Sequence, residues 1–153
     1  MKLIIENWKR FLTESVSYSA VVIDQASVDA LMDAAREFGI PDGFVHKTKA
    51  GKPLPHHMTI KMGGLFSKKA SKDYSNIYKV GDEVIMKVVA IGLDENAMAA
   101  KVELPEGKKS KNKIPPVTPA IPEGGRPSSS NKIPLENWKP IKPFDISGTV
   151  KEV

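Results

Sequence analysis

The densest group of acid–base residues in this chain is the segment 55–60 (PHHMTI). Side chains alternate between the two faces of a strand, so an extended segment places His57 and Thr59 on one face, with His56 and Met58 on the other. Imidazole titrates near neutral pH and transfers protons, and a threonine hydroxyl donates a hydrogen bond to a phosphate oxygen. The pattern favours a strand face suited to phosphate chemistry. For the triplet His57-Met58-Thr59 taken alone, an exposed polar strand face is the simpler interpretation.

The elements that position this group come from the first half of the chain. Apolar and β-branched residues predict strands over residues 18–23 and 57–62. Between them, apolar residues at helical spacing predict a helix that begins near the candidate caps Asp24 and Ser27 and ends at Gly39. The loop that follows the helix is rich in proline and glycine.

The second half of the chain predicts further strands. Residues 84–91 and 97–104 form a predicted hairpin. Nine of the twelve prolines lie between residues 105 and 143, yet apolar alternation over 114–121 still predicts a strand. Residues 144–153 predict a closing strand. This order of elements indicates an α+β domain with a mostly antiparallel sheet.

Composition limits the possible functions. The chain has 153 residues, of which 41% are hydrophobic and 27% charged, and these values are typical of a globular protein. It has no cysteine, which excludes disulfides, thiolate metal sites and cysteine nucleophiles. No apolar run approaches the roughly 20 residues of a membrane span. We therefore expect a cytoplasmic protein with no membrane partner, and neither a cofactor nor a metal site is predicted.

Residues 2–14 predict a short amphipathic helix, with Trp8 and Phe11 on its apolar face. A polar break over residues 15–17 separates it from the first strand. The sequence therefore predicts two parts, an N-terminal helix over residues 1–14 and a domain over residues 15–153. Packing of the helix against the domain and docking of the helix on a partner both remain open.

The chain resembles the two-histidine phosphoesterase superfamily, which includes the LigT-like RNA cyclic phosphodiesterases and bacteriophage anti-CBASS nucleases. Members have two H-hydrophobic-T-hydrophobic strands, one in each pseudo-symmetric lobe, that face each other across a nucleotide cleft. Residues 57–60 (HMTI) match the first motif, residues 113–121 (KIPPVTPAI) resemble the second, and residues 146–153 resemble the last strand. The resemblance covers residues 16–153. It implies a two-lobed α+β fold, with antiparallel sheets and flanking helices around a central cleft.

The second motif departs from the family pattern, because Pro116 stands where the second histidine is expected and Pro119 replaces an aliphatic residue. In the family, one imidazole takes a proton from the attacking group and the other protonates the leaving oxygen. Each such role is typically worth roughly 10²–10⁴ in rate, and proline performs neither. His46 and Lys113 are possible substitutes, whereas strand alternation predicts that His56 points away.

The prolines of this second motif also affect the backbone, because they have no amide hydrogen to donate to a neighbouring strand. The strand over residues 114–121 is therefore expected to lie at an edge, to contain a bulge or to pair poorly.

The resemblance implies catalytic-type roles for His57, Thr59 and Thr118. Tyr18 and Trp138 are candidates for stacking on nucleobases, although both residue types also serve ordinary packing.

Three hypotheses follow. The first is a protein that binds a nucleotide, a cyclic oligonucleotide or an RNA end, has weakened or lost phosphodiesterase activity, and sequesters a nucleotide signal in phage counter-defence. The second is an active phosphodiesterase that uses His57 with a substitute acid. The third is a phage structural or interaction module. A viral protein would act in the host cytoplasm, and the oligomeric state is left open.

Overall fold

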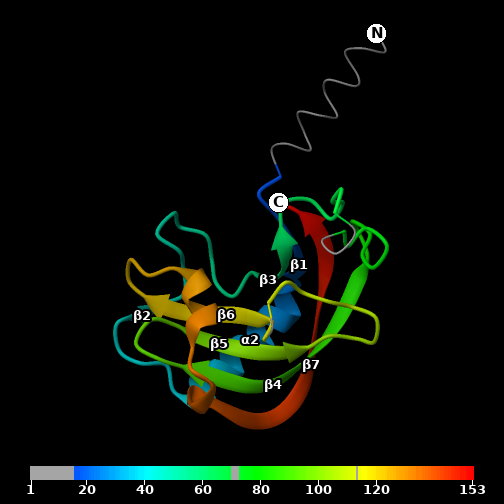
Figure 1. Cartoon of the computed structure of the whole chain (residues 1–153). Helices are drawn as coiled ribbons and strands as arrows, with labels where there is room; N and C mark the ends of the chain where they lie inside the picture. Colours follow the sequence, from blue (N-terminus) through cyan, green and yellow to red (C-terminus); the bar gives the residue numbers. More distant parts are fainter. Residues whose placement is uncertain (1–15, 70–72, 113) are drawn as a thin grey trace.

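The computed structural model describes residues 16–69, 73–112 and 114–153 (Figure 1). The helix predicted over residues 2–14 lies outside these residues. The elements in chain order are β1 (Tyr18–Ile23), α2 (Gln25–Phe38), β2 (Phe44–Val45), β3 (His57–Met62), β4 (Glu83–Leu93), β5 (Met98–Glu103), β6 (Pro116–Pro122), the 3-10 helices η2 (Pro127–Lys132) and η3 (Leu135–Asn137), and β7 (Trp138–Glu152).

Six antiparallel strands form a closed barrel. They are hydrogen-bonded in the order β6-β3-β1-β7-β4-β5, and β5 pairs again with β6, while the short β2 adds to β6. The predicted α+β class with a mostly antiparallel sheet is therefore confirmed. The segment just before β1 lies beside the end of β7, because the Ser17 amide donates to the Val153 carbonyl at 2.8 Å. No helix in the part of the chain that the structure describes is long and apolar enough to cross a membrane.

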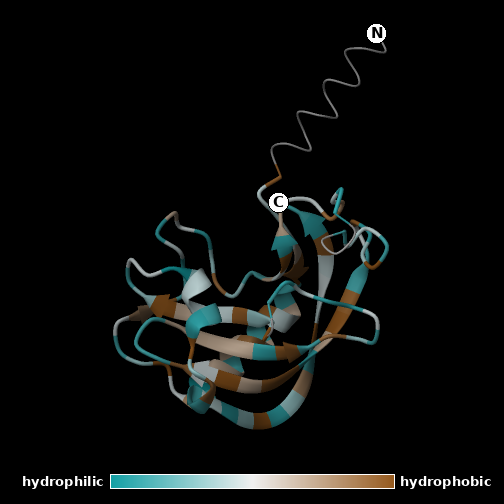
Figure 2. Ribbon diagram, in the orientation of Figure 1, coloured by the Kyte–Doolittle hydropathy of each residue, from teal (hydrophilic) through white to brown (hydrophobic). Residues whose placement is uncertain are grey.

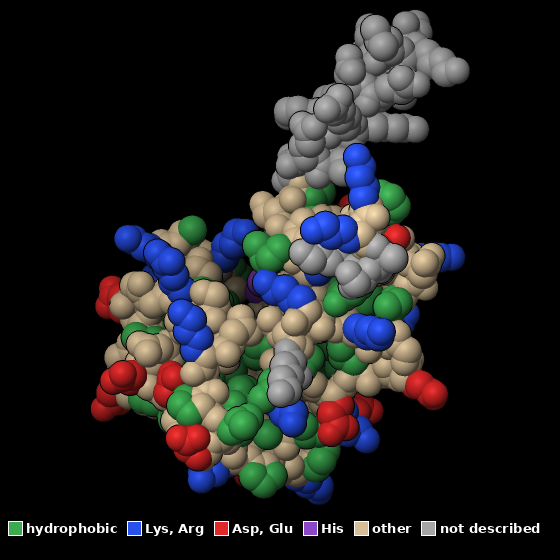
Figure 3. Space-filling model, in the orientation of Figure 1, with side chains coloured by type: hydrophobic (Ala, Val, Ile, Leu, Met, Phe, Trp, Pro, Cys, Tyr) green, Lys and Arg blue, Asp and Glu red, His purple; other side chains and the backbone are tan. Residues whose placement is uncertain are grey.

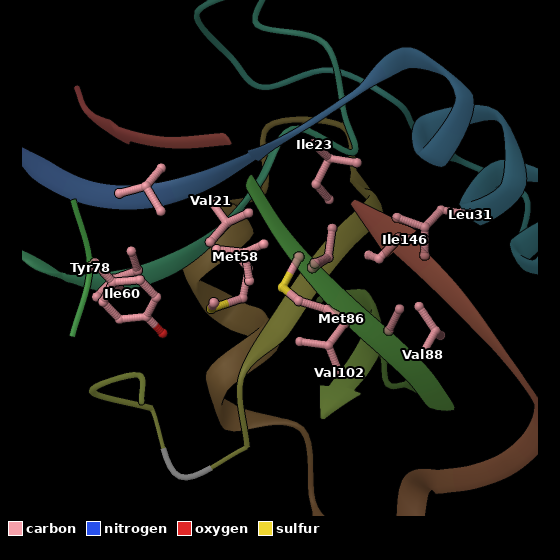
Figure 4. Packing of buried hydrophobic residues seen from close by; sticks show 14 of the residues in the cluster. Val21, Ile23, Leu31, Met58, Ile60, Tyr78, Met86, Val88, Val102 and Ile146 are labelled. Atoms are coloured by element: carbon pink, nitrogen blue, oxygen red, sulfur yellow. The ribbon is translucent and has the colours of Figure 1, made fainter. Parts of the chain in front are cut away.

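The interior of the barrel is filled by aliphatic and methionine side chains from all six strands (Figure 4). Hydropathy alternates along the long strands, as Figure 2 shows, and in β4 every second residue from Val84 to Val88 is buried. Burial of each such side chain contributes roughly 1.5–3 kcal/mol to folding. Met58 and Val117, both fully buried, belong to this cluster.

The helix α2 is fixed at both ends. The Asp24 carboxylate accepts a hydrogen bond from the Ser27 amide at 2.9 Å, which makes Asp24 the N-cap. The Ser27 hydroxyl in turn accepts from the Ser147 amide at 2.8 Å, so the start of the helix is attached to β7. Gly39 ends the helix with φ of 111°, a conformation that suits glycine. The predicted cap at Asp24 and stop at Gly39 are therefore confirmed, whereas Ser27 lies within the first turn of the helix and is not a cap.

The proline-rich strand β6 lies inside the sheet and not at an edge, because β3 and β5 flank it. Its pairing is irregular, as the lack of amide donors predicts. It pairs with β3 at one register position, Met58 opposite Val117, and its ladder with β5 shifts between Met98 and Ala100. The closing strand β7 begins at Trp138, earlier than the predicted residue 144.

Candidate functional site

The candidate site lies on the outer face of the barrel, where β3 and β6 pair. Met58 and Val117 are directly opposite each other and point into the barrel interior. Because side chains alternate along a strand, the residues that flank these two point to the other face. The four flanking residues are His57, Thr59, Pro116 and Thr118, and all four line one cavity.

This cavity has a volume of about 180 Å³. Leu54 and Met62 form apolar parts of its wall, and among the described residues Lys111 is the one lysine or arginine in the lining. No Asp or Glu lines it in the part of the chain that the structure describes. Figure 3 shows histidine surface at the bottom of a hollow with Lys or Arg side chains around it. The charge balance of the cavity therefore suits an anion.

The His57 ring is held by two neighbouring rings. Its Nδ1 lies 2.9 Å from the Nδ1 of His56, so one imidazole donates this hydrogen bond and the other accepts it. The Tyr18 ring stacks on His57 with centroids 4.8 Å apart and an interplanar angle of 26°. Because Nδ1 faces His56, Nε2 is the nitrogen of His57 that remains for a ligand.

Both imidazoles are shifted toward the neutral form. Burial, together with the positive charges of His56 and Lys52, lowers the pKa of His57 to about 4. The pKa of His56 is also lowered, first by burial and then by Lys52 and Lys151. At neutral pH His57 is therefore uncharged, a state that accepts a proton or a hydrogen bond but is a poor acid.

The prediction that His56 points away from His57 and its cavity is wrong. His56 lines the same cavity as His57. The reason is that β3 begins at His57, so His56 belongs to the preceding loop and is not bound by strand alternation.

Thr118 is positioned by a helix that follows its own strand. Its Oγ1 lies 2.6 Å from the hydroxyl oxygen of Ser130 in η2, and both side chains are buried. This contact orients the hydroxyl at the base of the cavity. Asn131, the next residue of η2, lines the cavity as well.

The lysine-rich segment after β5 forms another wall of the cavity. The Ser110 hydroxyl donates to the Thr59 carbonyl at 2.7 Å, and the Lys111 amide donates to the Ile60 carbonyl at 2.7 Å. These bonds attach the segment to β3 and bring Lys111 and Asn112 to the cavity. The one signal in the sequence that points to Lys111 is the basic run over residues 108–113 (KKSKNK).

The two predicted nucleobase-stacking residues lie at different places. Tyr18 packs on His57 and is not part of the cavity lining. Trp138 lines a second cavity beside the first, and a Cβ added to Gly92 would lie 2.7 Å from its indole, so the ring rests closely on β4.

Of the possible substitute acids, His46 is exposed, with its Nδ1 2.9 Å from the Pro119 carbonyl oxygen, and it does not line the cavity. Lys113 lies outside the described residues.

Within residues 16–69, 73–112 and 114–153, no group of three or more His, Asp or Glu side chains is arranged to hold a metal ion. Neither a protein-family model nor a curated protein matches this chain. The geometry and charge of the cavity are therefore the features of this chain that bear on its function.

Proposed function

We propose that this protein binds a nucleotide, a cyclic oligonucleotide or an RNA end, and that its phosphodiesterase activity is weakened or lost. The observation that carries the proposal is the antiparallel pairing of His57-Met58-Thr59 with Pro116-Val117-Thr118 on one cavity wall. Two threonine hydroxyls and the Lys111 ammonium are groups that hold phosphate oxygens.

The local symmetry of the two strands supports the resemblance to two-histidine phosphoesterases. In an antiparallel pair, a two-fold rotation between opposite residues exchanges the two strands. About Met58 and Val117, this rotation exchanges Thr59 with Thr118 and His57 with Pro116. Pro116 therefore occupies the position that the second imidazole has in the family pattern. We also propose the two-lobed, pseudo-symmetric architecture that the resemblance implies.

The chemistry of the cavity favours binding over turnover. At neutral pH His57 is in the protonation state of a base, but its pKa of about 4 makes it a weak one. The position related to His57 by the two-fold rotation offers no proton to the leaving oxygen, because Pro116 has no titrating group. Loss of one acid–base role typically costs roughly 10²–10⁴ in rate. A protein that sequesters a nucleotide signal, as in phage counter-defence, needs only the binding.

One observation favours an alternative, an active phosphodiesterase. His56 lines the cavity and shares a hydrogen bond with His57, so it is the nearest candidate for a substitute acid. Its lowered pKa limits this role at neutral pH. In this alternative, turnover increases as the pH falls and disappears in His56→Ala.

Incubation of the pure protein with linear, 2′,3′-cyclic and cyclic-oligonucleotide ligands tests both functions. Calorimetry measures affinity, and chromatography of the mixture measures products. We expect binding with turnover well below roughly 1 s⁻¹, the lower end of ordinary enzyme rates. The double substitution Thr59→Val and Thr118→Val should weaken binding. If none of these ligands gives a binding heat or a product, both functions are contradicted. The remaining hypothesis is then a structural or interaction module.

A further inference from the structure

A second cavity adjoins the candidate site and has a volume of about 410 Å³. Its apolar wall consists of side chains from β7, η3 and the segments that flank η2 and β6. They are Ile114, Ile133, Leu135 and Trp138. Lys111, Asn112 and Asn131 line both cavities, so the two are adjacent and share these residues as a common wall. The Thr118–Ser130 hydrogen bond also links them, since Thr118 lines the first cavity and Ser130 the second.

The volumes of the two cavities indicate which part of a ligand molecule each of them accommodates. Small-molecule sites typically have volumes of roughly 300–1,000 Å³. At about 180 Å³, the first cavity accommodates a phosphate group but not a whole nucleotide. The rest of the ligand must extend along the surface, and the shared residues Lys111 and Asn131 lead into the larger cavity.

The walls of the second cavity suit a flat, mostly apolar group with polar edges. Leu135 is 74% exposed, an unusual state for a large aliphatic side chain that lines a depression. The indole of Trp138 rests closely on Gly92 and presents an aromatic wall. Two amides, Asn112 and Asn131, offer both donors and acceptors at the rim. A nucleobase has this combination of a π-face and polar edges.

We infer that the second cavity is a nucleobase subsite, which receives the base of the ligand whose phosphate lies between β3 and β6. The inference rests on the proposed function and extends it, because it assigns each part of the ligand to a place. The Lys111 ammonium lies between the two subsites and pairs with the phosphate. The base packs against Leu135 and Trp138.

The test uses a chain in which Trp138 is the one tryptophan left. The sequence has two tryptophans, so Trp8→Phe leaves Trp138 alone as a fluorescent reporter. This protein is titrated with the four nucleoside 5′-monophosphates and with ribose 5-phosphate, which has the phosphate but no base. We expect at least one nucleotide to change the Trp138 emission and to bind about tenfold or more tightly than ribose 5-phosphate.

A variant pair then separates the subsite from the phosphate site. Leu135→Asp should lower nucleotide affinity about fivefold or more and leave ribose 5-phosphate affinity unchanged. Val80→Asp is the matched control, because Val80 is 60% exposed and lines neither cavity. Equal affinity for nucleotide and ribose 5-phosphate, with no effect of Leu135→Asp, would overturn the nucleobase subsite alone. No binding of any of the five compounds would also overturn the subsite, whereas the proposed function fails only if the linear, 2′,3′-cyclic and cyclic-oligonucleotide ligands do not bind either.

Discussion

At the scale of single residues, the proposed function depends on Pro116. The Pro116→His variant adds an imidazole at the position that the two-fold rotation relates to His57, and it restores a backbone donor to β6, which pairs there with Lys101 of β5. We expect turnover of 2′,3′-cyclic nucleotides to rise by roughly 10²-fold or more, the usual scale of one acid–base role. Product formation by the wild type and the variant, measured at equal protein concentration, checks this expectation.

The control for this gain is His57→Ala in the Pro116→His background, which should remove it. A wild type that already turns over at roughly 1 s⁻¹ or faster would contradict the degenerate site. Loss of that activity in His56→Ala would then identify His56 as the acid.

The burial of His57 predicts how stability depends on pH. The pKa of His57 falls from 6.5 in the unfolded chain to about 4 in the folded protein. Between these values the unfolded chain binds a proton that the folded protein does not, so the free energy of unfolding decreases as the pH falls from about 6.5 to about 4. From about pH 7 to about pH 4.5 this group should contribute a loss of about 2 kcal/mol.

Urea unfolding of wild type and of His57→Gln, each at about pH 7 and about pH 4.5, measures that contribution. The quantity compared is the loss of the free energy of unfolding between the two pH values in each protein. The variant should lose about 2 kcal/mol less on acidification than the wild type. Equal losses in wild type and His57→Gln would show that His57 titrates normally.

The sequence predicts one part of the site and not the other, for a physical reason. His57 and Thr59 lie in a regular strand, where alternation determines their common face. His56 precedes that strand, and Asn131 arrives from a 3-10 helix, so no periodicity specifies where their side chains point. Lys111 reaches the cavity through hydrogen bonds of its own segment to β3, a contact that composition does not reveal.

At the scale of elements, local signals predict the strands and the helix well. The predicted bounds of β1 and β3 agree with the structure, since apolar β-branched runs with breakers at their ends define them. Closure of the barrel was not predicted. It requires β5 to pair with the proline-rich β6, and the partner of a strand is chosen by packing of the whole sheet and not by its own alternation.

The contact between β4 and β7 depends on a glycine. Gly92 pairs with Trp138, and a Cβ at position 92 would lie 2.7 Å from the indole. We expect Gly92→Ala to lower the free energy of unfolding by about 1–3 kcal/mol, because the ring must move out of its packed position. Chemical denaturation measures this change. The displaced indole should also weaken nucleotide binding at the second cavity.

Gly64→Ala is the matched control for this substitution. Its new methyl group would meet only the Glu152 carboxylate, at 3.2 Å from the Oε1 that accepts a hydrogen bond from the Leu65 amide, and a shift of a few tenths of an ångström relieves this contact and keeps the bond. The free energy of unfolding should therefore change by less than about 0.5 kcal/mol. A similar loss in both variants would show that the indole is not the cause.

At the scale of the whole molecule, the described residues enclose a core. Three clusters of buried side chains lie inside the barrel and between the barrel and α2, and their described members fall between residues 21 and 150. The last strand is joined to the start of β1, where the Val153 amide donates to the Tyr18 carbonyl at 2.8 Å. The sequence predicts that residues 1–14 form a separate helix, divided from β1 by the break at residues 15–17.

Deletion of residues 1–13 should therefore leave a single cooperative thermal transition, shifted by a few degrees at most. Circular dichroism measures the transition, and the fluorescence of Trp138, the one tryptophan left by the deletion, follows the same unfolding near the cavities. Nucleotide affinity should also be unchanged, because no residue before Leu54 lines either cavity in the described part of the chain. A broad, non-cooperative transition would show instead that Ile4, Trp8 and Phe11 complete the core. Cooperative unfolding with lost affinity would assign the N-terminal segment to the binding site.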